Sequence, residues 1–320
     1  MCKIFHTMCF STLALACGAA YSQAYPSKPV KLIVPNAPTS APDVAARMLS
    51  ERLSRTMGQQ FILENNTAGS GLIAAQQAAR ATPDGYTLFI GSGSGMVVNP
   101  NIFKSVGYDT LKDFSPIAFL GESAFIIAVH PDVPAKSIAD WIALAKAQPG
   151  KLSYGADAGV NGIVGAWFNK MAGINTVHVP YKQLAPQIQD TVAGRTQMIL
   201  VSAVAIEPMV KAGKLRPIGL TSARRFPGME HIPTVAETVP GFQVGGWFIL
   251  TAPTGLPLSI TQRLNNEVDQ FLKDPAVVDK FRAFGFENQG AGSLPEVREF
   301  VRTELEKWAR IAKEAGVELQ

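Results

Sequence analysis

The feature of this sequence that most limits its fold is a repeated unit in which a short apolar run leads into a polar loop. Residues 30–34, 61–63 and 86–90 are apolar runs of strand length, and each precedes a loop rich in glycine, proline or small polar residues. Strands that recur at this spacing form parallel βαβ units, whose loops meet beyond the carboxyl ends of the strands. The first part of the chain therefore predicts an α/β sheet with a ligand crevice at one edge.

The same unit returns in the middle of the chain. Apolar runs at residues 116–120 and 125–129 are expected strands, and residues 152–154 form another that opens into a glycine-rich loop and a helix at residues 163–171. Residues 248–251 are interpreted as the strand that returns to the first half of the molecule, before three C-terminal helices.

We therefore predict an α/β chain of two domains. The first domain comprises residues 25–122 together with residues 246–320, and the second comprises residues 123–245. The two segments that cross between them, near Glu122 and Gly245, are expected to form a hinge.

Capping residues mark the starts of several helices. A serine followed three positions later by an acidic or amide residue has the spacing of a capping box. This spacing occurs at Ser137, Ser259 and Ser293. Asp43 is either a helix cap or a contact to a ligand, and the sequence leaves both readings open.

The first 24 residues have the pattern of an export signal. Lys3 precedes an apolar run, and Ser22 and Ala24 are small residues at the positions that a signal peptidase reads. We predict cleavage after Ala24 and an exported mature protein. An uncleaved membrane anchor and lipid attachment at Cys17 are the alternatives.

The composition argues against several kinds of chemistry. All three cysteines lie in the predicted signal, so the mature chain is expected to have no disulfide, thiol nucleophile or cysteine metal site. The remaining histidines, His130, His178 and His231, lack the spacing of a metal site, and we expect no metal and no cofactor. The net charge is +4 and the longest basic cluster is Arg224–Arg225, so we expect no nucleic-acid binding.

A secreted α/β hydrolase is the enzymatic alternative. Such an enzyme carries its nucleophile in a G-x-S-x-G elbow, which does not occur in this sequence. We therefore predict a binding protein without catalytic activity.

A series of short motifs follows a fixed order along the chain. The motifs lie at residues 25–29, 34–35, 43–44, 64–65, 83–88, 99–100, 108–109, 112–114, 149–152, 177–182, 211–216, 233–237 and 247–248. This series resembles the Bug family, the periplasmic receptors of tripartite tricarboxylate transporters. The resemblance covers essentially the whole mature chain.

The resemblance implies a two-domain fold of the periplasmic-binding-protein type, similar to type II, with a ligand cleft between the domains. It also implies a periplasmic receptor that captures a small carboxylate and delivers it to the membrane subunits of a tripartite transporter. We expect a monomer. A receptor that presents its ligand to a sensor protein is the alternative partner assignment.

Loops of this kind suit a carboxylate because the first N–H groups of a helix are unpaired and its dipole favours an anion there. The resemblance implies that backbone groups and water hold the carboxylate without an arginine clamp. The candidate ligand-binding residues are Asn36, Thr39, Ser40 and Asp43 in the first loop, Gly69 and Ser70 in the second, Ser92, Gly93 and Ser94 in the third, Ala156, Asp157, Gly159 and Asn161 in the fourth, and Tyr181, Ser202 and Phe248 elsewhere.

The sequence departs from the family pattern at three places. Thr39 and Ser40 stand where the family usually has a cluster of glycines. Their hydroxyl groups are expected to replace the backbone N–H donors of that cluster. Asn161 is expected to replace the Ser and His that usually end the fourth loop. Val201 stands where the family commonly has Asp, which suggests a more apolar wall and a ligand with an apolar or aromatic part.

Two further positions have competing interpretations. Lys182 is either a cation near the cleft or a solvated surface lysine. Trp247 is expected to belong to the core at the hinge, whereas the neighbouring Phe248 is expected to pack on the ligand.

Overall fold

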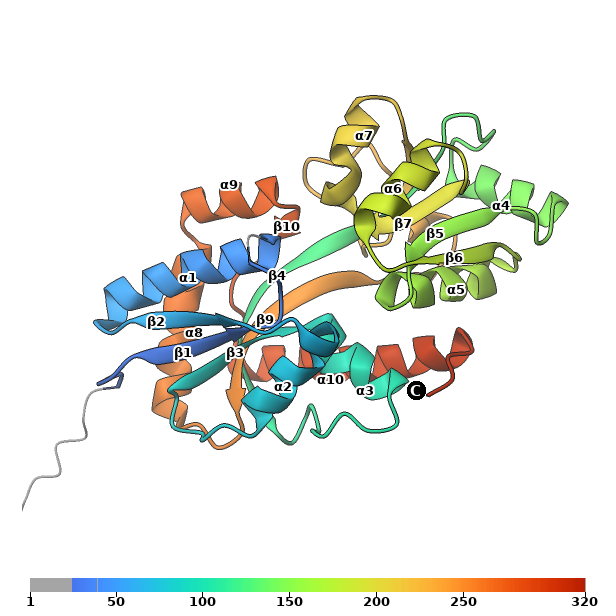
Figure 1. Ribbon diagram of the computed structural model, residues 1–320. Coiled ribbons are helices and arrows are strands. Elements are labelled where there is room, and N and C mark those ends of the chain that lie inside the picture. The colour runs from blue at the N-terminus through green and yellow to red at the C-terminus, as the bar shows by residue number, and fades with distance from the viewer. Residues whose placement is uncertain (1–24, 39, 320) are drawn as a thin grey trace, which may run out of the picture.

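The computed structural model describes residues 25–38 and 40–319. The predicted export signal, its cleavage after Ala24, and Thr39 lie outside the described residues. The described chain forms two lobes that share two long strands, with the first lobe at the lower left of Figure 1 and the second at the upper right. The α/β fold class is confirmed.

The sheet of the first lobe joins parallel and antiparallel strands. β1, β2 and β3 pair in parallel, as the repeated unit predicts, whereas β9 runs antiparallel to β3 and to β4. The order is β2-β1-β3-β9-β4, with β10 on the outer side of β4. These strands are β1 (Val30–Val34), β2 (Phe61–Asn65), β3 (Thr87–Ser92), β4 (Phe114–Val129), β9 (Gly245–Pro253) and β10 (Phe286–Glu287).

Helices cover both faces of this sheet because its central strands are apolar on both sides. Leu32 packs into the cluster with α1, α8 and α9, whereas the next residue, Ile33, packs into the cluster with α2 and α10. This alternation follows from the two-residue period of a strand. The helices are α1 (Ala41–Met57), α2 (Leu72–Ala79), α8 (Leu258–Leu272), α9 (Pro275–Ala283) and α10 (Leu294–Glu314).

The second lobe is a smaller sheet of order β8-β4-β7-β5-β6, in which β5 pairs in parallel with β6 and β7. The core cluster with α4 and α5 lies on one face, and the cluster with α6 and α7 on the other. The elements are α4 (Ile138–Ala147), β5 (Ser153–Asp157), α5 (Val160–Ala172), β6 (Val177–Tyr181), α6 (Leu184–Val192), β7 (Met198–Ser202), α7 (Glu207–Lys211) and β8 (Arg216–Leu220).

Short helical segments fill the connections next to the cleft. They are η1 (Ala68–Gly71), η2 (Ser94–Val98), α3 (Asn99–Ile102), η3 (Ala203–Ile206) and, farther away, η4 (Val235–Glu237).

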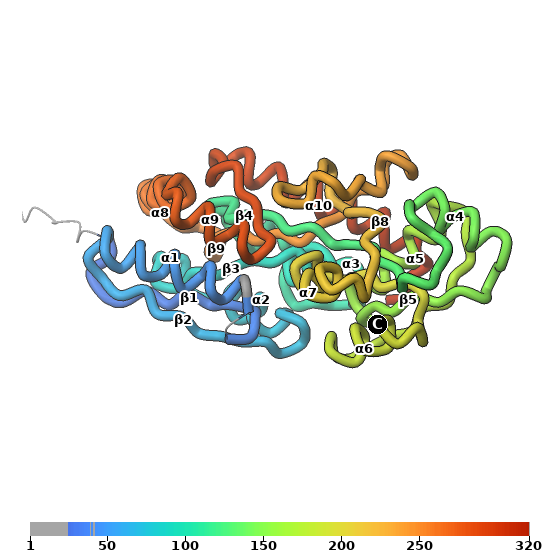
Figure 2. Tube along the Cα trace, turned by 90° about the horizontal axis from the view of Figure 1, so that it is seen from above, coloured from blue at the N-terminus to red at the C-terminus, as the bar shows by residue number. Residues whose placement is uncertain are grey.

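The two lobes are joined by β4, β9 and the end of α10. The expected strands at residues 116–120 and 125–129 are one continuous strand, β4, which pairs with β9 up to Ala124 and with β7 from Phe125. The C-terminal part of α10 extends beneath the second lobe (Figure 1 and Figure 2). There the indole Nε1 of Trp167 donates to Glu314 Oε2 at 2.7 Å. The division into domains at residues 122 and 245 stays a prediction.

Two of the three predicted serine caps are confirmed and one is wrong. Ser137 and Ser293 accept the backbone N–H groups of Asp140 and Glu296, as expected. The prediction for Ser259 is wrong, because α8 begins at Leu258 with Pro257 in the cap position, so Ser259 already lies inside the first turn. The cap position of α1 is Ser40, and Asp43 lies inside the first turn.

No helix in the described part of the chain is both long and apolar enough to cross a membrane.

An ion pair in the second lobe makes its stability depend on pH. Glu237 accepts from Arg225 at 2.8 and 2.9 Å, and this interaction lowers the pKa of Glu237 from 4.5 to about 2. Because the folded-state pKa lies below the unfolded one, the stabilisation is complete above pH 4.5 and is lost as pH falls toward 2. We expect Glu237→Gln to lower the melting temperature at about pH 6 and to lower it less at about pH 3.

Thermal unfolding at a series of pH values measures this difference. Glu51→Gln, at an exposed position of α1, is the matched control and should give the same small change at every pH. A melting-temperature gap for Glu237→Gln that does not narrow in acid would contradict the assignment.

Candidate ligand-binding site

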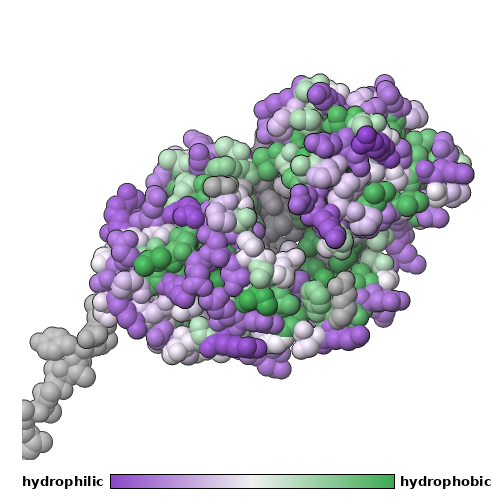
Figure 3. Space-filling view, viewed as in Figure 1, coloured by the Kyte–Doolittle hydropathy of each residue, from purple (hydrophilic) through white to green (hydrophobic). Residues whose placement is uncertain are grey.

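A cleft between the two lobes contains two adjoining pockets, and Figure 3 shows the surface hollowed at this place. We call them the aromatic pocket, of about 260 Å³, and the polar pocket, of about 640 Å³. Ser94, Val98, Phe125 and Val160 line both pockets, so the two form one continuous site.

The aromatic pocket has no charged side chain among its described lining residues. Six aromatic rings and four serines define its chemistry, which suits the apolar body of a small ligand together with a few hydrogen bonds. The aromatic residues are Phe125, Trp247, Phe248, Phe284, Phe286 and Trp308, and the serines are Ser92, Ser94, Ser123 and Ser202.

The polar pocket has a different character. Asp157 and Lys182 are the charged residues among its described lining, and they carry opposite signs. Asn99 comes from α3 in the first lobe and Asn161 from the first turn of α5 in the second, so the two lobes face each other across this pocket.

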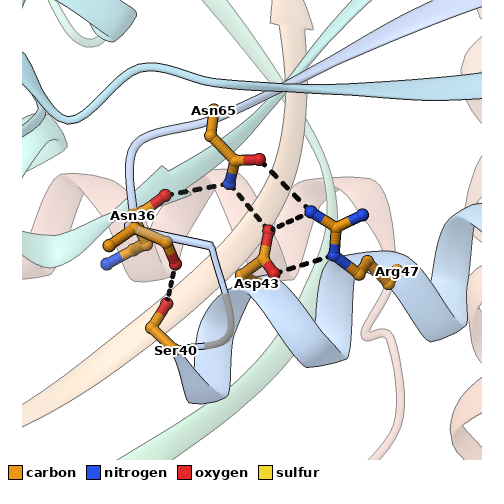
Figure 4. A network of polar contacts seen from close by, with 6 residues as sticks. Asn36, Ser40, Asp43, Arg47 and Asn65 are labelled. Atoms are coloured by element: carbon orange, nitrogen blue, oxygen red, sulfur yellow. Dashed lines mark hydrogen bonds and ion pairs between the residues drawn. The ribbon is translucent and has the colours of Figure 1, made fainter.

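The first loop is held by a polar network around Asp43, shown in Figure 4. Asp43 is fully buried, and its carboxylate accepts from Arg47 Nε at 2.8 Å and from Asn65 Nδ2 at 2.7 Å. Asn65 also donates to the backbone oxygen of Asn36, and the hydroxyl of Ser40 donates to that of Ala37. The hydrogen bond to Asp43 raises the pKa of Arg47. These contacts hold the loop against the start of α1, where Pro42, in the first turn of the helix, lines the aromatic pocket.

The second loop reaches the cleft with one residue and the third loop with three. Ser70 lines the polar pocket from η1, where it has a positive φ of 53°. Ser92, the last residue of β3, and the following Gly93 and Ser94 line the aromatic pocket. A Cβ at Gly93 would lie 3.3 Å from the ring of Trp247, so glycine allows this close approach of strand and indole.

The fourth loop folds back onto its own aspartate. Asp157 Oδ1 accepts from the backbone N–H of Gly159 at 2.7 Å and from that of Asn161 at 3.3 Å. Asp157 Oδ2 accepts from the side chain of Asn161 at 2.5 Å. Ala156 is buried within β5 and points into the core.

The remaining candidates lie on β6, β7 and β9. The hydroxyl of Tyr181 donates to Asp190 at 2.8 Å, and burial together with this bond raises the pKa of Tyr181 to about 12. Ser202 lines the aromatic pocket at the end of β7. Phe248 lines it from β9, with its ring edge-on to Phe286 at 5.4 Å between centroids.

The structure therefore brings together part of the predicted set. Asn36, Ser40, Asp43, Gly69 and Ala156 line neither pocket, and Thr39 is outside the described residues. Ligand contact stays a prediction for every candidate. The candidates that line the cleft are Ser70, Ser92, Gly93, Ser94, Asp157, Gly159, Asn161, Tyr181, Ser202 and Phe248.

The expectation for Val201 is wrong. Val201 was expected to make a wall of the cleft more apolar, but its side chain packs among buried residues on the face of β7 that α6 and α7 cover. It alternates with Ser202, which faces the aromatic pocket, because successive side chains of a strand point to opposite faces.

Several residues that line the aromatic pocket were not predicted from the sequence. Phe125 lies three positions after Glu122, where the predicted crossing begins, so the hinge position could have indicated it. Phe284, Phe286 and Trp308 come from the C-terminal region, and no local pattern distinguishes them from ordinary core residues. Trp247 is buried as expected, with its Nε1 donating to Glu304 at 3.0 Å, and it also lines the aromatic pocket.

Comparison with known proteins places this architecture among receptors. Residues 45–317 match the family model described as tripartite tricarboxylate transporter family receptor. BugT of Bordetella pertussis is 29% identical over 304 residues, which cover 92% of each chain.

Two solved structures with ligands share the fold. The R. palustris protein Rpa4515, determined with adipate, is 35% identical with a TM-score of 0.79, and the match covers 92% of this chain and 100% of that one. MatC from Rhodopseudomonas palustris, determined with bound malate, is 26% identical with a TM-score of 0.73, covering 90% of this chain and 99% of that one.

Proposed function

This chain belongs to the tripartite tricarboxylate transporter receptor family, and on that premise we propose that the cleft between its lobes closes on one small carboxylate. The resemblance to the Bug family is confirmed by the match to this family and to BugT. The protein is a periplasmic solute-binding protein rather than an enzyme, and it works with the membrane components of a transporter.

The observation that carries the proposed ligand class is the arrangement of small polar residues in the cleft. Ser70 follows β2, Ser92 ends β3 and Ser94 follows it, so the carboxyl ends of two strands that both pair in parallel with β1 reach one cavity. Hydroxyl and backbone N–H donors can hold a carboxylate there without a buried cation. The ligands of Rpa4515 and MatC, adipate and malate, belong to the same chemical class.

The proposal also covers the export of the protein, its oligomeric state, its membrane partners, its hinge and its ligand contacts. The protein is exported by cleavage after Ala24, acts as a monomer, and delivers its ligand to a specific pair of membrane subunits. The lobes, divided near residues 122 and 245, move about β4 and β9; the exchange of strand partners at Ala124 and Phe125 supports this hinge. The lining residues among the predicted candidates contact the ligand.

A thermal-shift screen of the mature chain, residues 25–320, tests the carboxylate assignment. A ligand that binds only the native state is expected to add about 2.7 kcal/mol of stability at 100 times its dissociation constant. The library contains adipate, malate, aliphatic and aromatic monocarboxylates, and neutral analogues of the same size. We expect melting-temperature increases confined to carboxylates.

The protein is first unfolded and refolded so that any ligand retained from the cells is removed. If no carboxylate then raises the melting temperature while the refolded protein keeps its native circular dichroism, the proposed ligand class is wrong.

A further inference from the structure

In the second lobe, the carboxylate of Asp157 lies at the start of α5, next to the cleft. Asp157 accepts hydrogen bonds from the N–H groups of Gly159 and Asn161 and from the side-chain amide of Asn161. These groups surround the start of α5, a helix of 13 residues. Asp157 also lines the polar pocket, so its carboxylate is part of the cleft.

This arrangement changes what the second lobe can bind. The first N–H groups of a helix favour an anion. Here two of them already serve the carboxylate of Asp157, so a ligand carboxylate would lose those donors and would meet a like charge. Lys182, the other charged residue that lines the pocket, is an exposed side chain, whereas three hydrogen bonds fix Asp157 in place.

Two unsatisfied amide atoms in the same pocket point independently to a ligand. Asn99 is 3% exposed, and its Nδ2 donor has no partner among the described residues. Oδ1 of Asn161 is likewise buried without a partner. Buried polar atoms are normally hydrogen-bonded, so a molecule that fills this pocket is expected to offer a donor to Asn161. Asn99 then donates to an acceptor on that molecule or on a water that bridges to it.

We infer that this receptor selects monocarboxylates that carry a hydrogen-bond donor at the far end, and that it discriminates against dicarboxylates. The inference rests on the proposed function and names its substrate class. The ligand's carboxylate lies among the serine hydroxyls of the aromatic pocket, and its apolar body lies against the aromatic rings. Its hydroxyl, amide or ammonium group lies in the polar pocket, on Asp157 and Asn161.

Calorimetric titration of two matched sets of ligands tests this selection. The first set is 6-aminohexanoate, hexanoate and adipate, and the second is 4-aminobenzoate, benzoate and terephthalate. The members of each set share a body and differ in the group at one end. We expect the amino acid of the better-binding set to bind wild-type protein at least about tenfold more tightly than the dicarboxylate.

The substitution Asp157→Asn tests whether this side chain causes the preference against dicarboxylates. The amide keeps an acceptor for the helix N–H groups but removes the charge, so we expect the preference over the dicarboxylate to shrink by about tenfold or more. Asp132→Asn removes a charge from the same lobe at a side chain that is 92% exposed, and it should leave the preference unchanged. If Asp157→Asn does not fold, the wild-type ligand series still decides the question.

The outcomes separate a failure of this inference from a failure of the proposed function. Wild-type protein that binds dicarboxylates as tightly as the matched amino acids, or a screen in which only dicarboxylates bind, overturns this inference and leaves the proposed function standing. An unchanged preference in Asp157→Asn overturns the role of Asp157. Binding of no carboxylate in either assay overturns the proposed function itself.

Discussion

The substitution Ser94→Trp is expected to abolish ligand binding, with a loss of affinity of more than about 100-fold. Ser94 is the one predicted site residue that lines both pockets, so its side chain lies where they join. An indole at this position occupies much of a cavity of about 260 Å³ and blocks passage into the polar pocket. The backbone there is helical and not strained, so the larger side chain is compatible with the fold.

Calorimetric titration of the strongest ligand from the thermal-shift screen measures this loss. Ser259→Trp, at an exposed position near the start of α8, introduces the same side chain away from the cleft and should keep wild-type affinity. The melting temperature of the ligand-free Ser94→Trp protein shows whether it is folded. A folded Ser94→Trp protein with wild-type affinity would show that the ligand lies elsewhere.

The substitution Trp308→Ala is expected to lower the free energy of unfolding by about 3–5 kcal/mol. Trp308 is 1% exposed and belongs to the core cluster that includes buried residues of both lobes. It also lines the aromatic pocket, so the cavity left by its removal adjoins the site. The loss combines the transfer free energy of the indole with the cost of a cavity that the surrounding helices and strands cannot close.

Equilibrium unfolding in urea, followed by circular dichroism, measures this effect. Arg310→Ala, at an exposed position of the same helix, is the control and should change the free energy by less than about 0.5 kcal/mol. A loss of less than about 1 kcal/mol for Trp308→Ala would mean that the indole contributes little to the shared core.

Local features of the chain account for much of the first lobe. The apolar runs at residues 30–34 and 61–63 form β1 and β2, and the loops after them lie at the expected edge. These predictions succeed because a strand of a buried sheet needs a continuous apolar run, which is visible in the sequence alone. The capping box at Ser293 succeeds for the same reason, since its hydrogen bonds join residues three positions apart.

The direction of a strand side chain depends on register, which the sequence does not show. Val201 and Ser202 are neighbours, yet one packs under α6 and α7 and the other lines the cleft. A shift of one residue in strand register reverses these roles, and sequence alone does not fix the register of β7 against β4.

The sequence by itself determined the α/β class, the family, and the polar loops that supply Ser92 and Ser94. Only the tertiary structure decided that Phe286 and Trp308, far along the chain, line the same pocket as these serines. It also decided that Asp157 turns back onto the start of α5. The physical reason is that helix and strand patterns depend on neighbouring residues, whereas a binding cavity depends on which surfaces of distant elements pack together and on what they leave unfilled.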